Sequence, residues 1–185
     1  ETVRGNIREI NPKALIIDNH DPGFDHSGFI KNTSAGYLGD YAYGGNSYSL
    51  NYAAWTFDVV PGTYRVSLTW PERPYTEGTK APFRIYDGTQ TTGTLLATVL
   101  VNQRNLPPQQ DVFYGGFWFQ DLGPGGNGGI YTVTGNKLTV YVKNLGGDGR
   151  LAIDGVITAD AVRIEPLSTL LAKADGAAAA AAGFE

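Results

Sequence analysis

Short runs of alternating apolar and polar side chains, each ending at turn-forming residues, are the feature that most limits how this chain can fold. Residues 53–60 alternate in this way around Trp55 and Phe57, the pair Pro61-Gly62 follows, and residues 63–70 resume the alternation. A period of two residues is that of a half-buried β-strand, and Pro-Gly marks a turn. The two segments therefore predict a β-hairpin whose apolar face lies in the core.

More strands of the same kind are predicted along the chain, and no segment before Leu167 has a helical period. They cover residues 14–17, 82–86, 95–101, 116–120, 138–143 and 156–164, with a weaker one at 2–10. Many short strands at this spacing predict an all-β fold, a two-sheet antiparallel β-sandwich of the jelly-roll type, over residues 1–166. Residues 167–185 contain six consecutive alanines and predict a linker or a short helical tail.

Composition excludes several classes of function. The chain has 185 residues, no cysteine and a formal net charge of −4. Without cysteine there are no disulfides, thiolate nucleophiles or cysteine-ligated metals. The negative charge argues against nucleic-acid binding, and the apolar runs are shorter than the roughly 20 residues of a membrane helix. Methionine is also absent, even at position 1, which leads us to expect either a mature, exported chain or a fragment cut from a longer one.

Several local motifs, taken in order, resemble the golvesin/xanthan-lyase carbohydrate-binding-like domain. They span residues 17–165, and the first is Ile17-Asp18-Asn19-His20-Asp21-Pro22-Gly23-Phe24. The others are Ala54-Trp55-Thr56-Phe57, Pro61-Gly62-Thr63-Tyr64-Arg65-Val66, Thr69-Trp70-Pro71, residues 81–88, Val101-Asn102-Gln103-Arg104 and Ala159-Asp160-Ala161-Val162-Arg163-Ile164. The resemblance implies a secreted β-sandwich that serves as a non-catalytic accessory or cell-surface module, without implying a particular ligand.

Residues 18–26 form the densest polar segment and contain both histidines. Asp18, Asp21 and Asp25 could supply oxygen ligands to Ca²⁺, although their spacing is not that of an EF-hand. The interpretation that we favour is structural: these carboxylates and Asn19 bond to nearby backbone amides and hold a turn. A catalytic His–Asp pair is not expected, since no nucleophile motif accompanies it. No cofactor is expected to be required, and Ca²⁺ remains an option.

Asp160 is expected to have a structural role. It lies inside the apolar segment 156–164, where a carboxylate would be buried. A buried carboxylate needs hydrogen-bond partners. We predict that backbone amides or Arg104 supply them.

The aromatic residues divide into a core set and an outward set. Residues that alternate with polar neighbours are assigned to the core: Trp55, Phe57 and Tyr64, with Val66 and Leu68. Neighbouring side chains of a strand point to opposite faces, so at least one of residues 117–119 should face outward. Exposed aromatic rings contact sugars or partner proteins, and both options stay open. The candidate ligand or interface aromatics are Tyr37, Tyr41, Tyr43, Trp70, Tyr75, Phe117 and Trp118.

Two functions are therefore predicted for a secreted or surface-displayed chain that is not an enzyme. The first is a structural subunit of an extracellular filament or surface assembly, a homopolymer joined by strand addition through residues 1–10 and by contacts of residues 167–185. The second is a carbohydrate-binding accessory module of a polysaccharide-degrading or adhesive protein. Catalysis is not expected because no nucleophile elbow, histidine-rich metal motif or paired carboxylates are identifiable.

Overall fold

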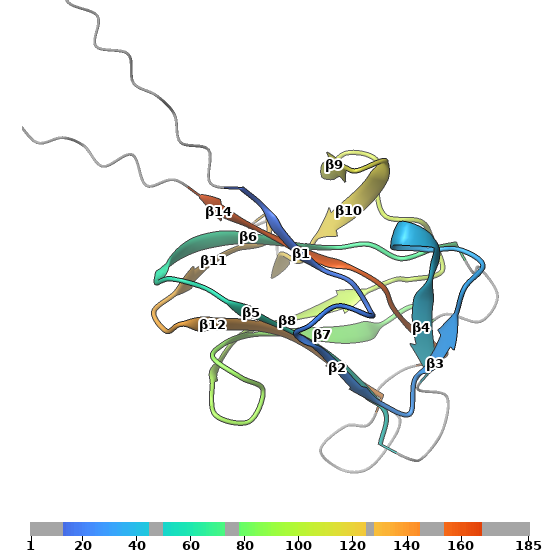
Figure 1. Ribbon diagram of the computed structural model, residues 1–185, viewed down its shortest axis with the longest axis horizontal. Coiled ribbons are helices and arrows are strands. Elements are labelled where there is room, and N and C mark those ends of the chain that lie inside the picture. Colours follow the sequence, from blue (N-terminus) through green and yellow to red (C-terminus); the bar gives the residue numbers. More distant parts are fainter. Residues whose placement is uncertain (1–12, 45–49, 73–77, 125–127, 145–153, 168–185) are drawn as a thin grey trace, which may run out of the picture.

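Two antiparallel β-sheets pack face to face, with a small third sheet at one end (Figure 1). This computed structural model describes residues 13–44, 50–72, 78–124, 128–144 and 154–167. Within these residues the first sheet has the order β1–β14–β6–β10–β9, and β11 also pairs with β6. Its strands are β1 (Leu15–Ile17), β6 (Gly62–Leu68), β9 (Val112–Tyr114), β10 (Phe117–Asp121), β11 (Ile130–Val133) and β14 (Val162–Leu167).

The second sheet has the order β2–β5–β12–β7–β8, and the third has the order β13–β4–β3. The strands of the second are β2 (Phe24–Ser27), β5 (Tyr52–Asp58), β7 (Ala81–Asp87), β8 (Thr94–Val101) and β12 (Lys137–Lys143). The third contains β3 (Ile30–Asn32), β4 (Tyr41–Gly44) and β13 (Ile157–Ala159), and a short 3-10 turn, η1 (Tyr37–Gly39), precedes β4. The predicted all-β sandwich is thus confirmed.

The core lies between the two large sheets and is built by the alternation seen in the sequence. Trp55 and Phe57 of β5 face it from one side, and Val66 and Leu68 of β6 face it from the other. Each of these four side chains is at most 3% exposed. Removing large apolar side chains from water in this way is the main favourable contribution to folding.

The predicted hairpin of residues 53–60 and 63–70 is wrong, although both strands exist. β5 pairs with β2 and β12, whereas β6 pairs with β14, β10 and β11. The turn at Pro61-Gly62 carries the chain from one sheet across to the other. Both arrangements bury the same alternate side chains, so the pattern alone does not distinguish a hairpin from a crossover between sheets.

The predicted single strand at 156–164 is also wrong, because the chain breaks at Asp160 and Ala161. β13 ends before the break in the third sheet, and β14 begins after it in the first. The backbone groups at the break find partners elsewhere. The Trp55 indole N–H donates to the Asp160 carbonyl at 3.0 Å, and the Thr69 N–H donates to the Ala161 carbonyl at 3.0 Å.

Both predicted assembly segments fall largely outside the described residues: the strand-exchange segment at 1–10 entirely, and the tail from residue 168 onward. Their predicted roles stay predictions. Among the helical segments of the described residues, none has the length and hydropathy that crossing a bilayer would require.

Candidate functional site

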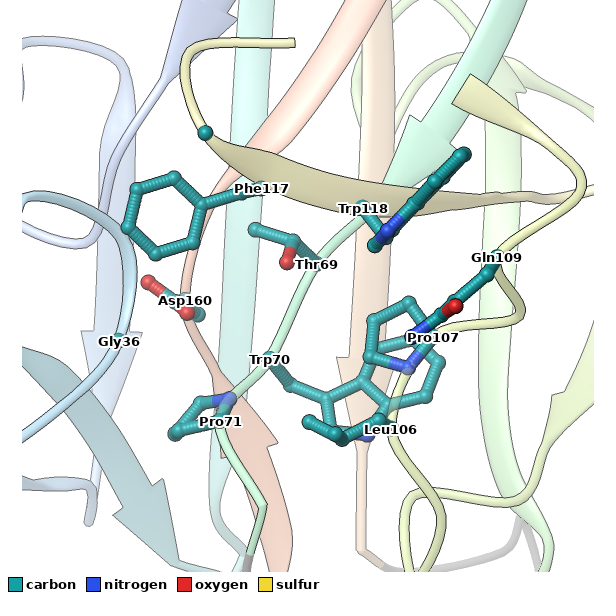
Figure 2. Close-up of a pocket in the computed structure, with 11 residues that line it drawn as sticks. Gly36, Thr69, Trp70, Pro71, Leu106, Pro107, Gln109, Phe117, Trp118 and Asp160 are labelled. Carbon is teal, nitrogen blue, oxygen red and sulfur yellow. The ribbon is translucent and has the colours of Figure 1, made fainter. Parts of the chain in front are cut away.

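An aromatic pocket of about 280 Å³ lies beside strand β10 (Figure 2). Figure 2 shows β10, with Phe117 and Trp118, on one side of the pocket and the segment of Trp70 and Pro71 on the other. The lining is mostly apolar. It comprises Gly36, Thr69, Trp70, Pro71, Leu106, Pro107, Gln109, Gly116, Phe117, Trp118 and Asp160.

Trp70 forms a fixed wall of this pocket. It follows the end of β6 and is only 2% exposed. Its indole N–H donates to the Asn105 carbonyl at 2.8 Å, which holds the segment that contains Leu106 and Pro107 against the wall. A buried ring with a satisfied N–H is rigid, so this wall is formed before a ligand arrives.

Trp118 belongs to the β9–β10 hairpin, which borders the pocket. The two-residue turn is Gly115-Gly116, and both glycines have positive φ, as the tight turns of β-hairpins require. Trp118 lies opposite Phe113 on β9, with the two ring centres 4.9 Å apart. Trp118 and Phe117 are half-buried, whereas Phe119 is fully buried. Both partly exposed rings belong to the lining of the pocket, whereas Phe119 does not.

Tyr37 supports the pocket from behind Phe117 rather than lining it. Its ring packs edge-on against Phe117 and Phe119, with ring centres 5.1 and 5.9 Å apart. Its backbone N–H lies 3.0 Å from both carboxylate oxygens of Asp160. This contact ties η1 to the break between β13 and β14, so the two segments hold the pocket's polar corner together.

Asp160 is the buried acidic group of the pocket, 1% exposed. Burial raises its pKa well above the ordinary value, and the charges of Asp18 and Asp40 add to the effect. Asp160 was expected to bind a backbone amide, and in the structure its carboxylate accepts the N–H of Tyr37. Arg104, the other partner considered, is exposed. The hydrogen bond from the Thr79 side chain is the main cause of the lowered pKa of Asp154, and the charge of Arg104 adds a small part.

The remaining candidate aromatics do not line the pocket. Tyr41 and Tyr43 lie on β4, with ring centres 6.1 Å apart. Tyr41 is 4% exposed and belongs to the interior, whereas Tyr43 is half-buried. Tyr75 lies outside the described residues.

The three aspartates proposed for Ca²⁺ do not come together. Asp25 lies on β2, where its carboxylate accepts a hydrogen bond from the Tyr52 hydroxyl at 2.9 Å. Asp21 accepts the backbone N–H of Asp18 at 3.0 Å and so holds the turn after β1. Asp25 belongs to strand β2, so its side chain lies apart from those of Asp18 and Asp21. The spacing of the three residues in the sequence does not show this separation.

Asp18 instead faces His20 and Asp40. The His20 Nδ1 lies 3.3 Å from Asp18 Oδ2 and 3.4 Å from Asp40 Oδ1. Asn19 is buried at this point and donates its amide to Asp40 Oδ1 at 2.8 Å, which joins the two segments. Burial raises the pKa of Asp18 to about 6. Burial also raises that of Asp40, but hydrogen bonds from Lys31 and Asn19 outweigh it and leave the pKa below its ordinary value.

The fold is shared with part of a known enzyme. A Paenibacillus xanthan lyase superposes on this chain with a TM-score of 0.59 and 24% sequence identity. The match covers 84% of this chain and 13% of the lyase chain, so the chain corresponds to a small part of that protein. No known family matches the sequence, and no curated protein does. The golvesin-like family resemblance therefore stays a prediction, supported in its fold by the lyase.

Several pocket residues carry no distinctive signal in the sequence. Leu106, Pro107 and Gln109 come from the segment between β8 and β9, which reads only as a proline-containing loop. They reach the pocket because the Trp70 indole binds the Asn105 carbonyl. The assembled site is a mainly apolar cavity with a few polar groups, which is the composition of small-molecule binding sites.

Proposed function

We propose that this chain is a non-catalytic carbohydrate-binding module that works outside the cell or at its surface. The aromatic pocket between Trp118, Phe117 and Trp70 is the observation that carries the proposal. The CH-rich face of a sugar ring is apolar, and its edge carries hydroxyl groups. A half-buried tryptophan beside a preformed cavity can pack against the apolar face of the ring, and a few polar side chains can bind the hydroxyl groups at its edge.

Gln109, Thr69 and Asp160 are the polar side chains available to the hydroxyl groups. Gln109 is exposed and offers both an amide donor and a carbonyl acceptor. Asp160 offers carboxylate oxygens at the polar corner of the cavity. In the proposed complex the sugar ring therefore lies against Trp118, and the hydroxyl groups of the sugar point toward Gln109 and Asp160.

The charge around the pocket favours an uncharged sugar. Asp18 and Asp40 lie near enough to Asp160 for their charges to raise its pKa. A ligand carboxylate in the cavity would add another negative charge to this group at low local dielectric, which is unfavourable. The net charge of −4 acts in the same direction at longer range.

The comparison with the xanthan lyase supports an accessory role. This chain is similar to a part that makes up 13% of an enzyme whose name indicates action on xanthan, a polysaccharide. Absence of catalysis is proposed from the pocket itself. Glycosidases flank the sugar with two carboxyl groups, whereas Asp160 is the sole acidic residue among the described residues that line this cavity.

The filament function receives no support of this kind. Its segments, residues 1–10 and 167–185, lie almost entirely outside the described residues. It therefore stays a prediction from the sequence.

Affinity electrophoresis through gels that contain a polysaccharide tests the proposal. We expect an uncharged glucan or mannan to retard the chain, and Trp118→Ala to remove most of that retardation. Tyr86→Ala is the matched control, because Tyr86 is a half-buried tyrosine on β7 of the second sheet, packed on Tyr141. Retardation by acidic polysaccharides alone would contradict the charge argument. Free migration in every gel would contradict carbohydrate binding.

A further inference from the structure

Asp18, His20 and Asp40 form a compact group with the geometry of a metal site. Asp18 and His20 lie in the turn after β1, and Asp40 lies between η1 and β4. One ligand atom from each residue lies within 4.8 Å of the other two. The shortest of these separations start from His20 Nδ1, which lies 3.3 Å from Asp18 Oδ2 and 3.4 Å from Asp40 Oδ1.

A buried oxygen without a partner points into this group. The Asp18 side chain has no exposed surface, and its Oδ1 accepts the Asn19 backbone N–H at 2.8 Å. Its Oδ2 is buried and accepts no hydrogen bond from any described residue, although it faces His20. An ionised carboxylate oxygen that is buried and unpaired is strongly unfavourable, so it requires a nearby positive charge.

The positive groups in the described part of the chain do not meet this requirement. Lys31 Nζ lies 2.8 Å from Asp40 Oδ2, on the oxygen that faces away from His20. An imidazole nitrogen carries at most one proton, so His20 Nδ1 can serve Asp18 or Asp40 but not both. Asp21 also acts on Asp18 and adds negative charge, which leaves the group with an excess of carboxylates.

We propose that Asp18 Oδ2, Asp40 Oδ1 and His20 Nδ1 bind a zinc ion. Ligand atoms about 2.0–2.1 Å from a tetrahedral zinc are roughly 3.4 Å apart, which is close to both distances from His20 Nδ1. The nitrogen ligand favours zinc over Ca²⁺, which takes oxygen ligands. The site thus differs in both ion and ligands from a Ca²⁺ site at Asp18, Asp21 and Asp25.

The surroundings match those of metal-binding histidines. Such a histidine usually donates its second ring N–H to a carboxylate, and ligating carboxylates are themselves hydrogen-bonded. Asp21 Oδ1 lies 3.9 Å from His20 Nε2, on the side of that second nitrogen, although this distance is longer than a hydrogen bond. Asn19 donates to the ligating oxygen of Asp40 at 2.8 Å. His20 is 43% exposed in its side chain, which leaves room for water as a fourth ligand.

Gly36 lets the chain fold closely around Asp40. Its φ is +94°, and a Cβ at this position would lie 2.2 Å from the Asp40 carbonyl oxygen. A side chain at residue 36 would therefore displace Asp40. A zinc ion would lock the turn after β1 to this segment, which makes the ion structural.

Spectroscopy with cobalt tests the assignment on the full chain. After treatment with EDTA, one equivalent of Co²⁺ should produce the intense visible absorption of tetrahedral Co²⁺, and Zn²⁺ should displace it. His20→Ala and Asp40→Asn should each weaken binding by about tenfold or more. His26→Ala removes the other histidine, which is exposed on β2, and should leave the titration unchanged.

Thermal unfolding gives a second readout that does not depend on the spectrum. Zn²⁺ should raise the Tm of the wild-type chain and of His26→Ala, but not that of His20→Ala. Stabilisation by Ca²⁺ without stabilisation by Zn²⁺ would overturn the proposal, as would a cobalt spectrum that survives His20→Ala. Absence of both the cobalt band and the Zn²⁺ stabilisation would also overturn it, whatever the outcome of the polysaccharide experiment.

Discussion

The carboxylate of Asp160 and the backbone N–H of Tyr37 are joined by two contacts of 3.0 Å, one to each oxygen, across 123 positions of sequence. This pair connects the break between β13 and β14 to the turn η1. The Tyr37 ring then packs against Phe117 in the pocket wall. A buried polar contact therefore positions one side of the candidate sugar site.

Replacing Asp160 should separate the value of this hydrogen bond from the cost of burying the charge. Asp160→Ala leaves the Tyr37 N–H without its partner, which costs about 1–3 kcal/mol in a buried setting. Asp160→Asn keeps an acceptor and removes the charge, so we expect it to be clearly more stable than Asp160→Ala. Urea unfolding at pH 7 measures both. Equal stability of the two variants would show that the hydrogen bond contributes nothing.

Stability should depend on pH through Asp18. Its pKa in the folded chain is about 6 because of burial, against an ordinary value of 3.8. The folded state thus binds a proton between pH 6 and pH 4 that the unfolded chain does not bind. This group destabilises the fold above pH 6 and ceases to do so as the pH falls toward 4. The difference corresponds to at most about 3 kcal/mol.

Urea unfolding from pH 4.5 to 7.5 in EDTA measures this dependence, with Asp18→Asn as the comparison. We expect the wild-type chain to lose stability relative to Asp18→Asn as the pH rises through 6. The pKa of Asp160 is also raised, chiefly by burial and to a smaller extent by the charge of Asp18, so both proteins share the larger part of that contribution to the slope. A constant difference between the two proteins over this range would contradict the shifted pKa.

Gln103 should be essential to the third sheet. It is fully buried, donates its side-chain amide to the Thr158 carbonyl at 2.8 Å and accepts the Thr158 N–H at 3.0 Å. Gln103→Met keeps the volume but leaves both backbone groups of Thr158 without these bonds, at about 2–4 kcal/mol. Gln103→Glu keeps an acceptor and serves as the comparison. Wild-type stability of Gln103→Met in urea would refute this role.

The two tryptophans of the pocket should differ in their effect on folding. Trp70 is 2% exposed and hydrogen-bonded, so Trp70→Ala should cost about 3–5 kcal/mol. Trp118 is half-buried on a hairpin, so Trp118→Ala should cost much less. Thermal unfolding of both variants checks this, and similar losses would mean that the hairpin belongs to the folding core. Trp118 is therefore the residue to change when binding is measured.

Much of the fold follows from the sequence because the strands with a buried face have a clear two-residue period. The core residues Trp55, Phe57 and Val66 were all predicted from it and are buried. Short strands such as β2 and β3 were not predicted, since three or four residues give too little alternation to detect. The alternation around Pro61-Gly62 predicts a hairpin where the structure has a crossover between sheets, because strand pairing depends on partners far away in the chain.

The candidate site was predicted only in part. Aromatic neighbours in β10 indicated an outward ring, and Trp118 and Phe117 line the pocket. The residues opposite them depend on the bond between Trp70 and Asn105, which leaves no pattern in the sequence. Asp40 was missed for a similar reason, because it meets Asp18 and His20 only in space.

The dissociation constants of the wild-type chain, Trp118→Ala and Tyr86→Ala for a neutral oligosaccharide test the central claim most directly. Isothermal titration calorimetry measures all three with a fragment of whichever polysaccharide retards the chain. The account predicts that Trp118→Ala binds at least about tenfold more weakly, or 1.4 kcal/mol, while Tyr86→Ala binds as the wild type does. Unchanged affinity in Trp118→Ala, or an equal loss in Tyr86→Ala, would contradict a binding site in this pocket.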